Sequence, residues 1–506
     1  MKNLEIMDTT LRDGEQTPNV AYSPAEKLQI AKVLLKKVCV DRIEVASARV
    51  SEGEKEGAEK IINWAKTIGK ADAVEILGFT DGGKSIDWIK SIDGRVINLL
   101  TKGSETHCRG QLRKTPQEHY DLVCKDIDYA RTLDISVNVY LEDWSGGMRD
   151  NEDYVFDFTE QLLKKENVKR IMLADTLGIA NPANVVSWLK KMQEKFPTAQ
   201  FDFHAHNDYG LASGNSFSVA INGIDGIHTT VNNLGERAGN ATLCETVATI
   251  NDMTDRTTSV NEKHLVDISE LVESCSGKRV SANAPIIGVD VYTQTCGVHA
   301  DGDKKGNLYA NPLTPERFNR LRTYALGKLS GKASIDKNLE VLGIELDVSD
   351  RDKVLAEVIK LGDKKEKITT EDLPFIIADI LKTSAKDKLV DIIDYKVTSQ
   401  KSGSPLAKIT VKYKNEILEN EAKGDGGYDA FMKALRSALD TKGIELPSLI
   451  DYEVRIPPGG KTDALVETTI IWNDGDENTF TTIGLDSDQL EAAIKATIKM
   501  LNIIIN

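Results

Sequence analysis

The sequence lacks the segments that mark secreted and membrane proteins. Its six cysteines are scattered through 506 residues without a CxxC pair, so reduced thiols are expected rather than a disulfide framework. No run of 18 apolar residues occurs, which argues against a membrane-spanning helix. The first residues, "MKNLEIMDTTLRDGEQ", lack the apolar core of a signal peptide. We therefore expect a soluble, cytoplasmic protein.

Positive charge is also in deficit. The chain has 64 Lys and Arg against 79 Asp and Glu, a net charge of −15. This balance argues against nucleic acid as the main partner but leaves an anionic small-molecule ligand open. At this length, two or three domains are expected.

The first half alternates short β-branched runs with amphipathic helical stretches, which predicts an α/β fold. The predicted strands are 4–8, 42–47, 74–79, 95–100, 135–141, 170–175, 200–206 and 226–231. Helices are predicted over 23–38, 115–133 and 181–196, the first and last opening with a cap residue followed by proline. Eight such strands predict a (β/α)₈ TIM barrel. A doubly wound sheet is the alternative, but "DTTLRDGEQT" after the first strand is not a phosphate-binding turn.

The pattern changes beyond residue 280. Residues 281–312 are rich in Gly, Asn and Pro, and 350–382 return to helix. From about residue 390, a strand-strand-helix (ββα) unit is given twice. We predict a barrel at 1–280, a loop-rich and then helical linker region at 281–388, and a small α/β domain at 389–506.

Histidine is scarce, with seven in the chain, yet His204 and His206 lie one residue apart at a predicted strand end. Such a pair alone is more often packing than chemistry. In a barrel, however, strand ends converge, and the same rim receives Asp13 after the first strand and Asn240 after the last. This mixed oxygen and nitrogen set predicts a divalent ion with open positions rather than a closed structural zinc site.

Four segments carry a resemblance to a known family: "DTTLRDGEQT", "FHAHNDYGLASGNS", "NNLGERAGNATLCE" and "GVHADGDK". Together they resemble the metal-dependent acyl-CoA Claisen condensation enzymes, which include 2-isopropylmalate, homocitrate and citramalate synthases. Within that family, "NLLTKGS", "NVYLEDWS", "GDGGYDAF" and "DYEVRIPPGGKTDALVET" resemble the citramalate synthases. The resemblance covers essentially the whole chain, including the family's amino-acid-sensing regulatory domain.

The resemblance implies an acyltransferase that condenses acetyl-CoA with a 2-oxo acid. The implied ligands of Mg²⁺, Mn²⁺ or Zn²⁺ are Asp13, His204 and His206, with Asn240 as a weaker fourth. Arg12 would lie against the keto oxygen of the substrate, where negative charge develops. Thr176 would hold the substrate carboxylate through its hydroxyl.

The resemblance also places removal of the acetyl-CoA methyl proton near Glu142 and "VHADGD". His299 is expected to be the base or a proton relay, oriented by Asp301 and Glu142. Tyr309 is a candidate to reach the same site, although simple packing would account for it equally well. His107, His119, His228 and His264 match no motif and are expected to be structural or to lie at the surface.

The substrate side chain is expected to meet Leu77, Leu100 and Tyr140, which lie on inward positions near the ends of three strands. They offer room for a methyl group and no partner for a carboxylate, which favours pyruvate over 2-oxoglutarate. An isopropylmalate synthase typically has an "HIHM"-like stretch where this chain has "INLL", so pyruvate is also preferred over 2-oxoisovalerate. The expected activity is (R)-citramalate synthesis, with 2-isopropylmalate synthesis as the alternative. Leu77 and Leu100 could also simply fill the barrel.

The C-terminal domain is expected to bind an amino-acid effector at a homodimer interface. The candidate residues near its turns are Tyr428, Asp429, Tyr452, Ile456 and Val466. Isoleucine is the expected effector of a citramalate synthase, and leucine that of an isopropylmalate synthase; ordinary turn glycines would also explain these segments. A barrel lyase or aldolase is disfavoured by the repeated C-terminal units, and a non-catalytic binding protein by the complete polar set.

Overall fold

The structure is a computed structural model that describes residues 3–295, 299, 302, 306, 308–363, 368–381, 390–414, 416–455, 466–475 and 479–505. The chain divides into two compact units: residues 1–292 with 310–321, and residues 293–309 with 322–506. Each unit is described by itself. No helix within the described ranges is both long and apolar enough to cross a bilayer.

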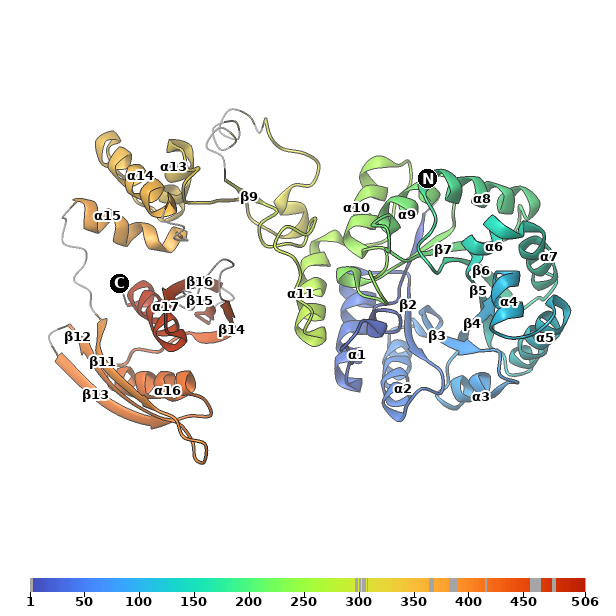
Figure 1. The fold of residues 1–506 in the computed structure, drawn as a ribbon, viewed down its shortest axis with the longest axis horizontal. Coiled ribbons are helices and arrows are strands. Elements are labelled where there is room, and N and C mark those ends of the chain that lie inside the picture. Colours follow the sequence, from blue (N-terminus) through green and yellow to red (C-terminus); the bar gives the residue numbers. More distant parts are fainter. Residues whose placement is uncertain are drawn as a thin grey trace. The chain divides into compact units, whose positions relative to one another are not determined.

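The first unit is a closed barrel of eight parallel strands in sequence order (Figure 1). The strands are β1 (Glu5–Asp8), β2 (Arg42–Ser47), β3 (Val74–Phe79), β4 (Val96–Lys102), β5 (Ser136–Glu142), β6 (Val168–Asp175), β7 (Phe201–Ala205) and β8 (Gly226–Thr229). Each coincides with a predicted strand to within a few residues. The barrel prediction is therefore confirmed, and β1 pairing with β8 excludes an open, doubly wound sheet.

Helices surround the strands (Figure 1). They are α1 (Pro24–Val33), α2 (Glu52–Thr67), α3 (Lys84–Ser91), α4 (Glu105–Gly110), α5 (Pro116–Thr132), α6 (Trp144–Asp150), α7 (Glu152–Leu162), α8 (Pro182–Lys195), α9 (Ala212–Ile221), α10 (Leu243–Met253) and α11 (Leu265–Ser276). The predicted caps are present: the side chains of Ser23 and Asn181 accept bonds from backbone N–H groups in the first turns of α1 and α8. These bonds satisfy N–H groups that have no partner within the helix.

The inside of the barrel is unusually polar. Along each strand, side chains alternate between the outer core, where Val137, Val139 and Leu141 of β5 lie, and the interior. At the amino-terminal end of the interior, Arg42 and Arg170 pair with three carboxylates, those of Glu5, Glu75 and Asp202. Because each buried charge has an oppositely charged partner, this network tolerates its low-dielectric surroundings.

The second unit contains a helical part and a C-terminal α/β part. The helices are α13 (Lys332–Val341), α14 (Val348–Asp363) and α15 (Leu373–Leu381), and short strands β9 (Thr293–Gln294) and β10 (Thr323–Tyr324) pair in parallel. The helices share a small apolar core that includes Ile335, Val354 and Leu373.

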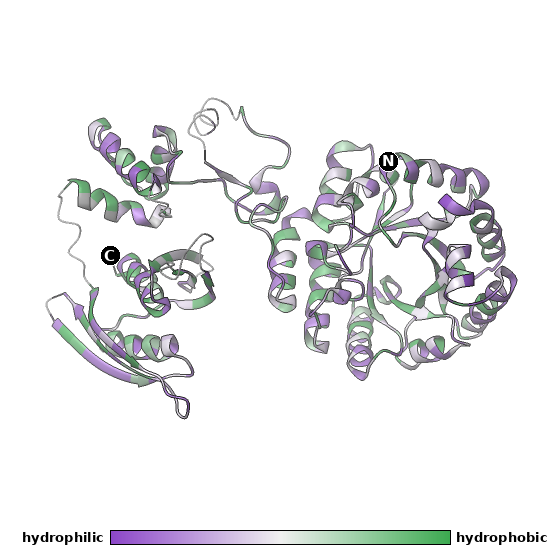
Figure 2. Cartoon of the chain, in the orientation of Figure 1, coloured by the Kyte–Doolittle hydropathy of each residue, from purple (hydrophilic) through white to green (hydrophobic). Residues whose placement is uncertain are grey.

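The C-terminal part repeats one unit twice, as the sequence predicted, with one more strand in each copy. The first copy is β11 (Val390–Thr398), β12 (Leu406–Tyr413), β13 (Glu416–Lys423) and α16 (Gly427–Asp440). The second is β14 (Ser448–Arg455), β15 (Val466–Asn473), β16 (Thr479–Asp486) and α17 (Gln489–Ile504). The sequence pattern predicts 407–422 as a single strand, but it forms two, because no glycine or proline marks the connection between Tyr413 and Glu416, which pair across it. The inward positions change from Ala407, Ile409 and Val411 in β12 to Leu418 and Ala422 in β13. Figure 2 shows both hydrophobic and hydrophilic residues along these strands, and in β12 the buried Ala407, Ile409 and Val411 alternate with more exposed residues, as expected for a sheet with one buried face.

Candidate active site

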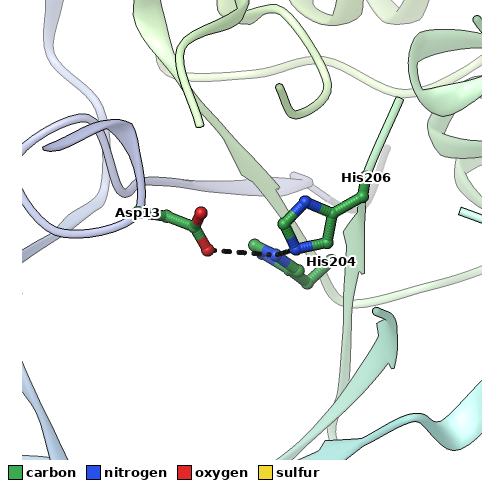
Figure 3. Close-up of side chains that lie close together, drawn as sticks. All are labelled: Asp13, His204 and His206. Atoms are coloured by element: carbon green, nitrogen blue, oxygen red, sulfur yellow. Dashed lines mark hydrogen bonds and ion pairs between the residues drawn. The ribbon is translucent and has the colours of Figure 1, made fainter. Parts of the chain in front are cut away.

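Three predicted metal ligands meet at the carboxyl end of the barrel strands. Asp13 follows β1, His204 lies on β7, and His206 follows that strand directly. Their ligand atoms lie within 4.8 Å of one another, and all three residues are buried. Nε2 of His204 is 3.4 Å from Oδ2 of Asp13 and 3.4 Å from Nε2 of His206 (Figure 3). Period-two alternation places both histidines on the same face of the strand, so the spacing itself brings them together.

The protonation states of these groups fit a cation. Burial lowers the pKa of His204 well below its usual range and also lowers that of His206, so both rings are neutral bases. Burial would raise the pKa of Asp13, but the positive charge of Arg12 holds it below its usual range, so the carboxylate is ionised. Two imidazole nitrogens and a carboxylate oxygen facing one another leave negative potential at the centre. A divalent ion matches that donor set.

Asn240 completes the same corner of the barrel. It forms an isolated backbone bridge with His206, and its Nδ2 donates to Oδ1 of Asp13 at 3.2 Å and to the carbonyl of Leu234 at 3.0 Å. Its Oδ1 is buried and has no partner among the residues that the structure describes. An orphaned amide oxygen beside Asp13 is suited to a weak metal contact.

The loop before Asn240 needs glycine for its shape. Gly239 adopts φ +83°, and a Cβ atom there would lie 1.8 Å from the carbonyl oxygen of Asn233. Arg237, also in this loop, donates to both carboxylate oxygens of Asp208 at 2.8 Å and to the carbonyl of Thr176 at 2.7 Å. The loop thereby joins the ends of β6 and β7 beside the metal ligands.

Arg12 is held between two carboxylates. Its Nε donates to Oε2 of Glu44 at 2.6 Å, and its Nη1 lies 3.0 Å from Oδ2 of Asp13. Glu44 is fully buried and also accepts bonds from the hydroxyl of Thr9 at 2.7 Å and from Nδ2 of Asn98 at 2.8 Å. The guanidinium is therefore fixed in direction before any substrate arrives, which is the arrangement that electrostatic catalysis requires.

An apolar cluster lies inside the barrel next to these polar groups. It consists of Met7, Leu77, Tyr140, Met172 and Ala174, with Leu100 packed against it. The Tyr140 ring belongs to this apolar cluster and also lies close to the polar groups of the site. Its centroid is 5.9 Å from that of His204 and 5.8 Å from the Arg12 guanidinium carbon. The three residues predicted for the substrate side chain therefore lie in one cluster, and that cluster adjoins the candidate metal ligands.

Two further predicted residues lie at the ends of neighbouring strands. Glu142, the last residue of β5, forms an ion pair with Lys102, the last residue of β4. Thr176 follows β6, and its Oγ1 accepts a bond of 2.8 Å from the backbone N–H of Asp143. The Thr176 hydroxyl proton therefore points elsewhere and can be donated to another group.

The remaining predicted residues belong to the second unit. His299 and Tyr309 are exposed, and their ring centroids are 4.3 Å apart. Asp301 and Ile456 lie outside the described residues. In the C-terminal part, the rings of Tyr428 and Tyr452 lie 5.1 Å apart.

Asp429 and Val466, the other two described residues predicted to bind the effector, have different neighbours from the two tyrosines. Asp429, on α16, pairs with Lys433 one helical turn along at 2.7 Å. Val466 begins β15 and pairs with Asp486 in the sheet. The structure thus joins the two tyrosines and gives Asp429 a local partner on its own helix.

Sequence reasoning missed three residues of the barrel site: Glu44, Lys102 and His228. His228 was expected to be structural or to lie at the surface; the structure places it inside the barrel, 3.0 Å from the Tyr140 hydroxyl, which agrees with a structural residue and gives it a contact with the site. The missed signal is alternation along β8: Ile227 faces the outer core, so His228 must face inward. Glu44 and Lys102 occupy inward and rim positions by the same rule, but their partners come from other strands.

Comparison with known proteins gives three matches along the chain. Residues 3–272 match the HMGL-like family, 286–366 the homocitrate synthase post-HMGL domain-like family, and 367–505 the LeuA allosteric (dimerisation) domain. The (R)-citramalate synthase CimA of Methanocaldococcus jannaschii is 30% identical over 505 residues, covering 99% of this chain and 100% of that protein. The 2-isopropylmalate synthase of the same organism is 31% identical, covering 98% and 94%. A putative (R)-citramalate synthase CimA of Methanopyrus kandleri is 31% identical, covering 99% and 96%.

Proposed function

We propose, since the chain belongs to the HMGL-like family and carries a LeuA allosteric (dimerisation) domain, that it is an (R)-citramalate synthase. The reaction joins the methyl carbon of acetyl-CoA to the keto carbon of pyruvate, and water then cleaves the thioester to release CoA and citramalate. Relatives of this chain are named as citramalate and as isopropylmalate synthases at similar identity. The family therefore supports a synthase of this type, and the choice of 2-oxo acid is our proposal.

Each polar residue of the barrel site would have a different role in such a condensation. Asp13, His204 and His206 would hold a divalent cation, which supplies a Lewis acid for the carboxylate and keto oxygens of the 2-oxo acid. Arg12 would face the keto oxygen as it gains negative charge, because Glu44 fixes the guanidinium direction and it remains charged at every relevant pH. Thr176 would donate its hydroxyl proton to the substrate carboxylate.

The apolar cluster carries the substrate assignment. Leu77, Leu100 and Tyr140 lie together beside Arg12 and His204, so we propose that the substrate side chain lies against them. A methyl group suits such surroundings, whereas a carboxylate would lose its hydration without gaining a partner. Discrimination between a methyl and an isopropyl group is weaker, because one methylene is worth only about 1–3 kcal/mol.

The proton-transfer residues are proposed from the family resemblance. His299 would be the base or relay, with Asp301 and Glu142 orienting it and Tyr309 reaching the same site. This role uses residues from 281–388, which we propose as linker subdomains between a catalytic part at 1–280 and a regulatory part at 389–506.

We propose that the C-terminal part forms a homodimer and binds isoleucine. The contact between the rings of Tyr428 and Tyr452 gives a surface against which an aliphatic side chain could pack, with Asp429, Ile456 and Val466 as further candidates. Isothermal titration should show isoleucine binding more tightly than leucine, and Tyr452→Ala should weaken that binding. Equal affinity for the two amino acids would contradict the assignment.

One assay tests the proposed function. CoA release is measured with pyruvate, 2-oxoisovalerate and 2-oxoglutarate in turn, with Mg²⁺ or Mn²⁺ and with EDTA. Pyruvate should give the highest kcat/KM, and EDTA should abolish turnover. Faster turnover of 2-oxoisovalerate would instead assign 2-isopropylmalate synthesis, and full activity after metal removal would refute the metal site.

A matched pair of variants tests the apolar cluster. Leu100→Ala should enlarge the space for the substrate side chain and shift preference toward 2-oxoisovalerate by about tenfold. Leu99→Ala removes the same volume from the adjacent residue, which packs in the outer core, and should leave the preference unchanged. The same shift in both variants would mean that Leu100 affects only stability.

A further inference from the structure

We propose that His228, anchored by Asp202, is a positioning residue that fixes the side chain of Tyr140 and thereby sets which 2-oxo acids the barrel accepts. The inference rests on the proposed function, because it concerns the residues to which we assign the substrate side chain. His228 belongs to β8 and lies outside every motif in the sequence.

Three buried residues from three strands form a continuous chain. The Tyr140 hydroxyl lies 3.0 Å from Nδ1 of His228, and Nε2 of His228 lies 3.2 Å from Oδ2 of Asp202. Tyr140 is 2% exposed, His228 is 1% exposed and Asp202 is fully buried. In this environment, an unmade hydrogen bond costs the full desolvation of the group, so each contact constrains its neighbours.

The chain assigns a direction to each proton. Both carboxylate oxygens of Asp202 already accept hydrogen bonds from arginine side chains, Oδ2 from Arg42 and Oδ1 from Arg170, so this group accepts from His228 as well. The ring hydrogen of His228 that faces Asp202 therefore lies on Nε2, and Nδ1 faces the Tyr140 hydroxyl as an acceptor. The Tyr140 hydroxyl must then donate to His228.

The anchor itself is rigid. Asp202 accepts bonds from Arg42 and Arg170, and Arg42 in turn donates to Glu75. These residues come from four strands of the closed barrel, so His228 is fastened to the barrel wall. The imidazole of His228 joins this charged network to Tyr140.

Two consequences follow for the apolar cluster. First, the Tyr140 ring cannot swing away, so the space bounded by Leu77 and Leu100 keeps its size. Second, the only polar hydrogen of Tyr140 is already donated to His228, so Tyr140 cannot donate a hydrogen bond to a carboxylate or other acceptor on the substrate side chain. Both effects favour a small, apolar substituent on the 2-oxo acid.

The experiment compares His228→Leu, His228→Asn, Tyr140→Phe and the double variant His228→Leu/Tyr140→Phe. Leucine removes the acceptor, whereas the amide oxygen of asparagine can replace Nδ1. The readout is the ratio of kcat/KM for pyruvate to kcat/KM for 2-oxoisovalerate. We expect this ratio to fall about tenfold in His228→Leu and in Tyr140→Phe. Asparagine should restore it to within about threefold of wild type.

The double variant separates positioning from general damage. If both residues act through one hydrogen bond, Tyr140→Phe should change the ratio less than twofold once His228 is leucine. Bound Mn²⁺, measured by metal analysis, should be equal in all four variants, because His228 contacts the ligand His204 only ring to ring. An unchanged ratio in Tyr140→Phe, additive effects in the double variant, or no restoration by asparagine would overturn the inference.

A measurement without substrate keeps the inference separate from the proposed function. Nitrogen-15 NMR of histidine-labelled protein should contain one ring with hydrogen on Nε2 and a bare Nδ1, and those signals should vanish in His228→Asn. The opposite tautomer at His228 would overturn the inference even in an active enzyme. Wild-type protein that releases no CoA with any 2-oxo acid would refute the proposed function and leave the NMR result to decide the role of His228.

Discussion

Glu44→Gln is the perturbation that tests most directly how the barrel positions Arg12. Glu44 accepts three hydrogen bonds, two on Oε2 from Thr9 and Arg12 and one on Oε1 from Asn98. Glutamine has the same shape but a single acceptor oxygen. Its amide NH₂ must therefore face at least one donor, and Arg12 loses its ionic partner inside the barrel.

The magnitude follows from burial. The side chain of Glu44 is fully buried and that of Arg12 is 9% exposed, so solvent cannot replace the lost contact. Breaking a buried ion pair by removing one partner costs about 3–5 kcal/mol. Because Asp13 still pairs with Arg12 at 3.0 Å, we expect the lower end, about 3 kcal/mol of unfolding free energy. The misdirected guanidinium should also lower kcat about 100-fold.

Urea unfolding of metal-free protein measures this cost. In a Trp472→Phe background, the tryptophans that remain all lie in the barrel, so their fluorescence reports that unit alone. The control is Asp72→Asn, which breaks a pair with Arg95 whose side chains are 77% and 52% exposed; its cost should stay below about 1 kcal/mol. A loss below about 1 kcal/mol in Glu44→Gln would refute the reasoning, since a buried pair would then be worth no more than an exposed one.

Three further predictions concern the metal, the loop and pH. Mn²⁺ at 100 times its Kd should raise the unfolding free energy of the wild-type protein by about 2.7 kcal/mol, as thermal unfolding would measure. His206→Ala should show no such increase, and an equal increase in both proteins would contradict the ligand assignment. Gly239→Ala should weaken Mn²⁺ binding at least tenfold, because its Cβ would overlap the carbonyl of Asn233. Gly214→Ala on α9, where a Cβ meets nothing within 4 Å, should leave binding unchanged, and a similar loss there would remove the steric argument. Burial lowers the pKa of His119 to about 4, so its neutral form stabilises the fold above pH 6.5 and that contribution, about 3 kcal/mol, disappears as the pH falls toward 4. His119→Gln should therefore lose less stability than wild type between pH 7 and 5, as urea unfolding at both values would reveal; parallel losses would argue against it.

The local sequence pattern was sufficient to predict the barrel because each helix and strand can be recognised from its own residues. Period-two runs give strands, proline after a cap residue gives helix starts, and eight repeats leave few topologies. The same alternation correctly placed Leu77, Leu100 and Tyr140 inside the barrel. It failed at 407–422, which it predicted as one strand, because no glycine or proline marks the hairpin that separates β12 from β13.

The candidate metal ligands were predictable for a related reason. A barrel brings all its strand ends to one rim, so residues after β1, β7 and β8 meet even though Asp13 and Asn240 are 227 positions apart. The partners of these residues were not predictable in this way. Which carboxylate faces Arg12, or which base faces Tyr140, depends on the stagger between strands, and no local pattern records that stagger.

The sequence by itself determined the strand order, the inward faces and the residue types that reach the barrel rim. These follow from hydrophobic alternation and chain connectivity, which are properties of neighbouring residues. Only the tertiary structure decided that Glu44 holds Arg12, that Lys102 pairs with Glu142, and that His228 joins Tyr140 to Asp202. Those contacts form inside the closed barrel, where side chains that are distant in the sequence come together in a buried space. The register between the strands decides which polar group lies opposite which partner.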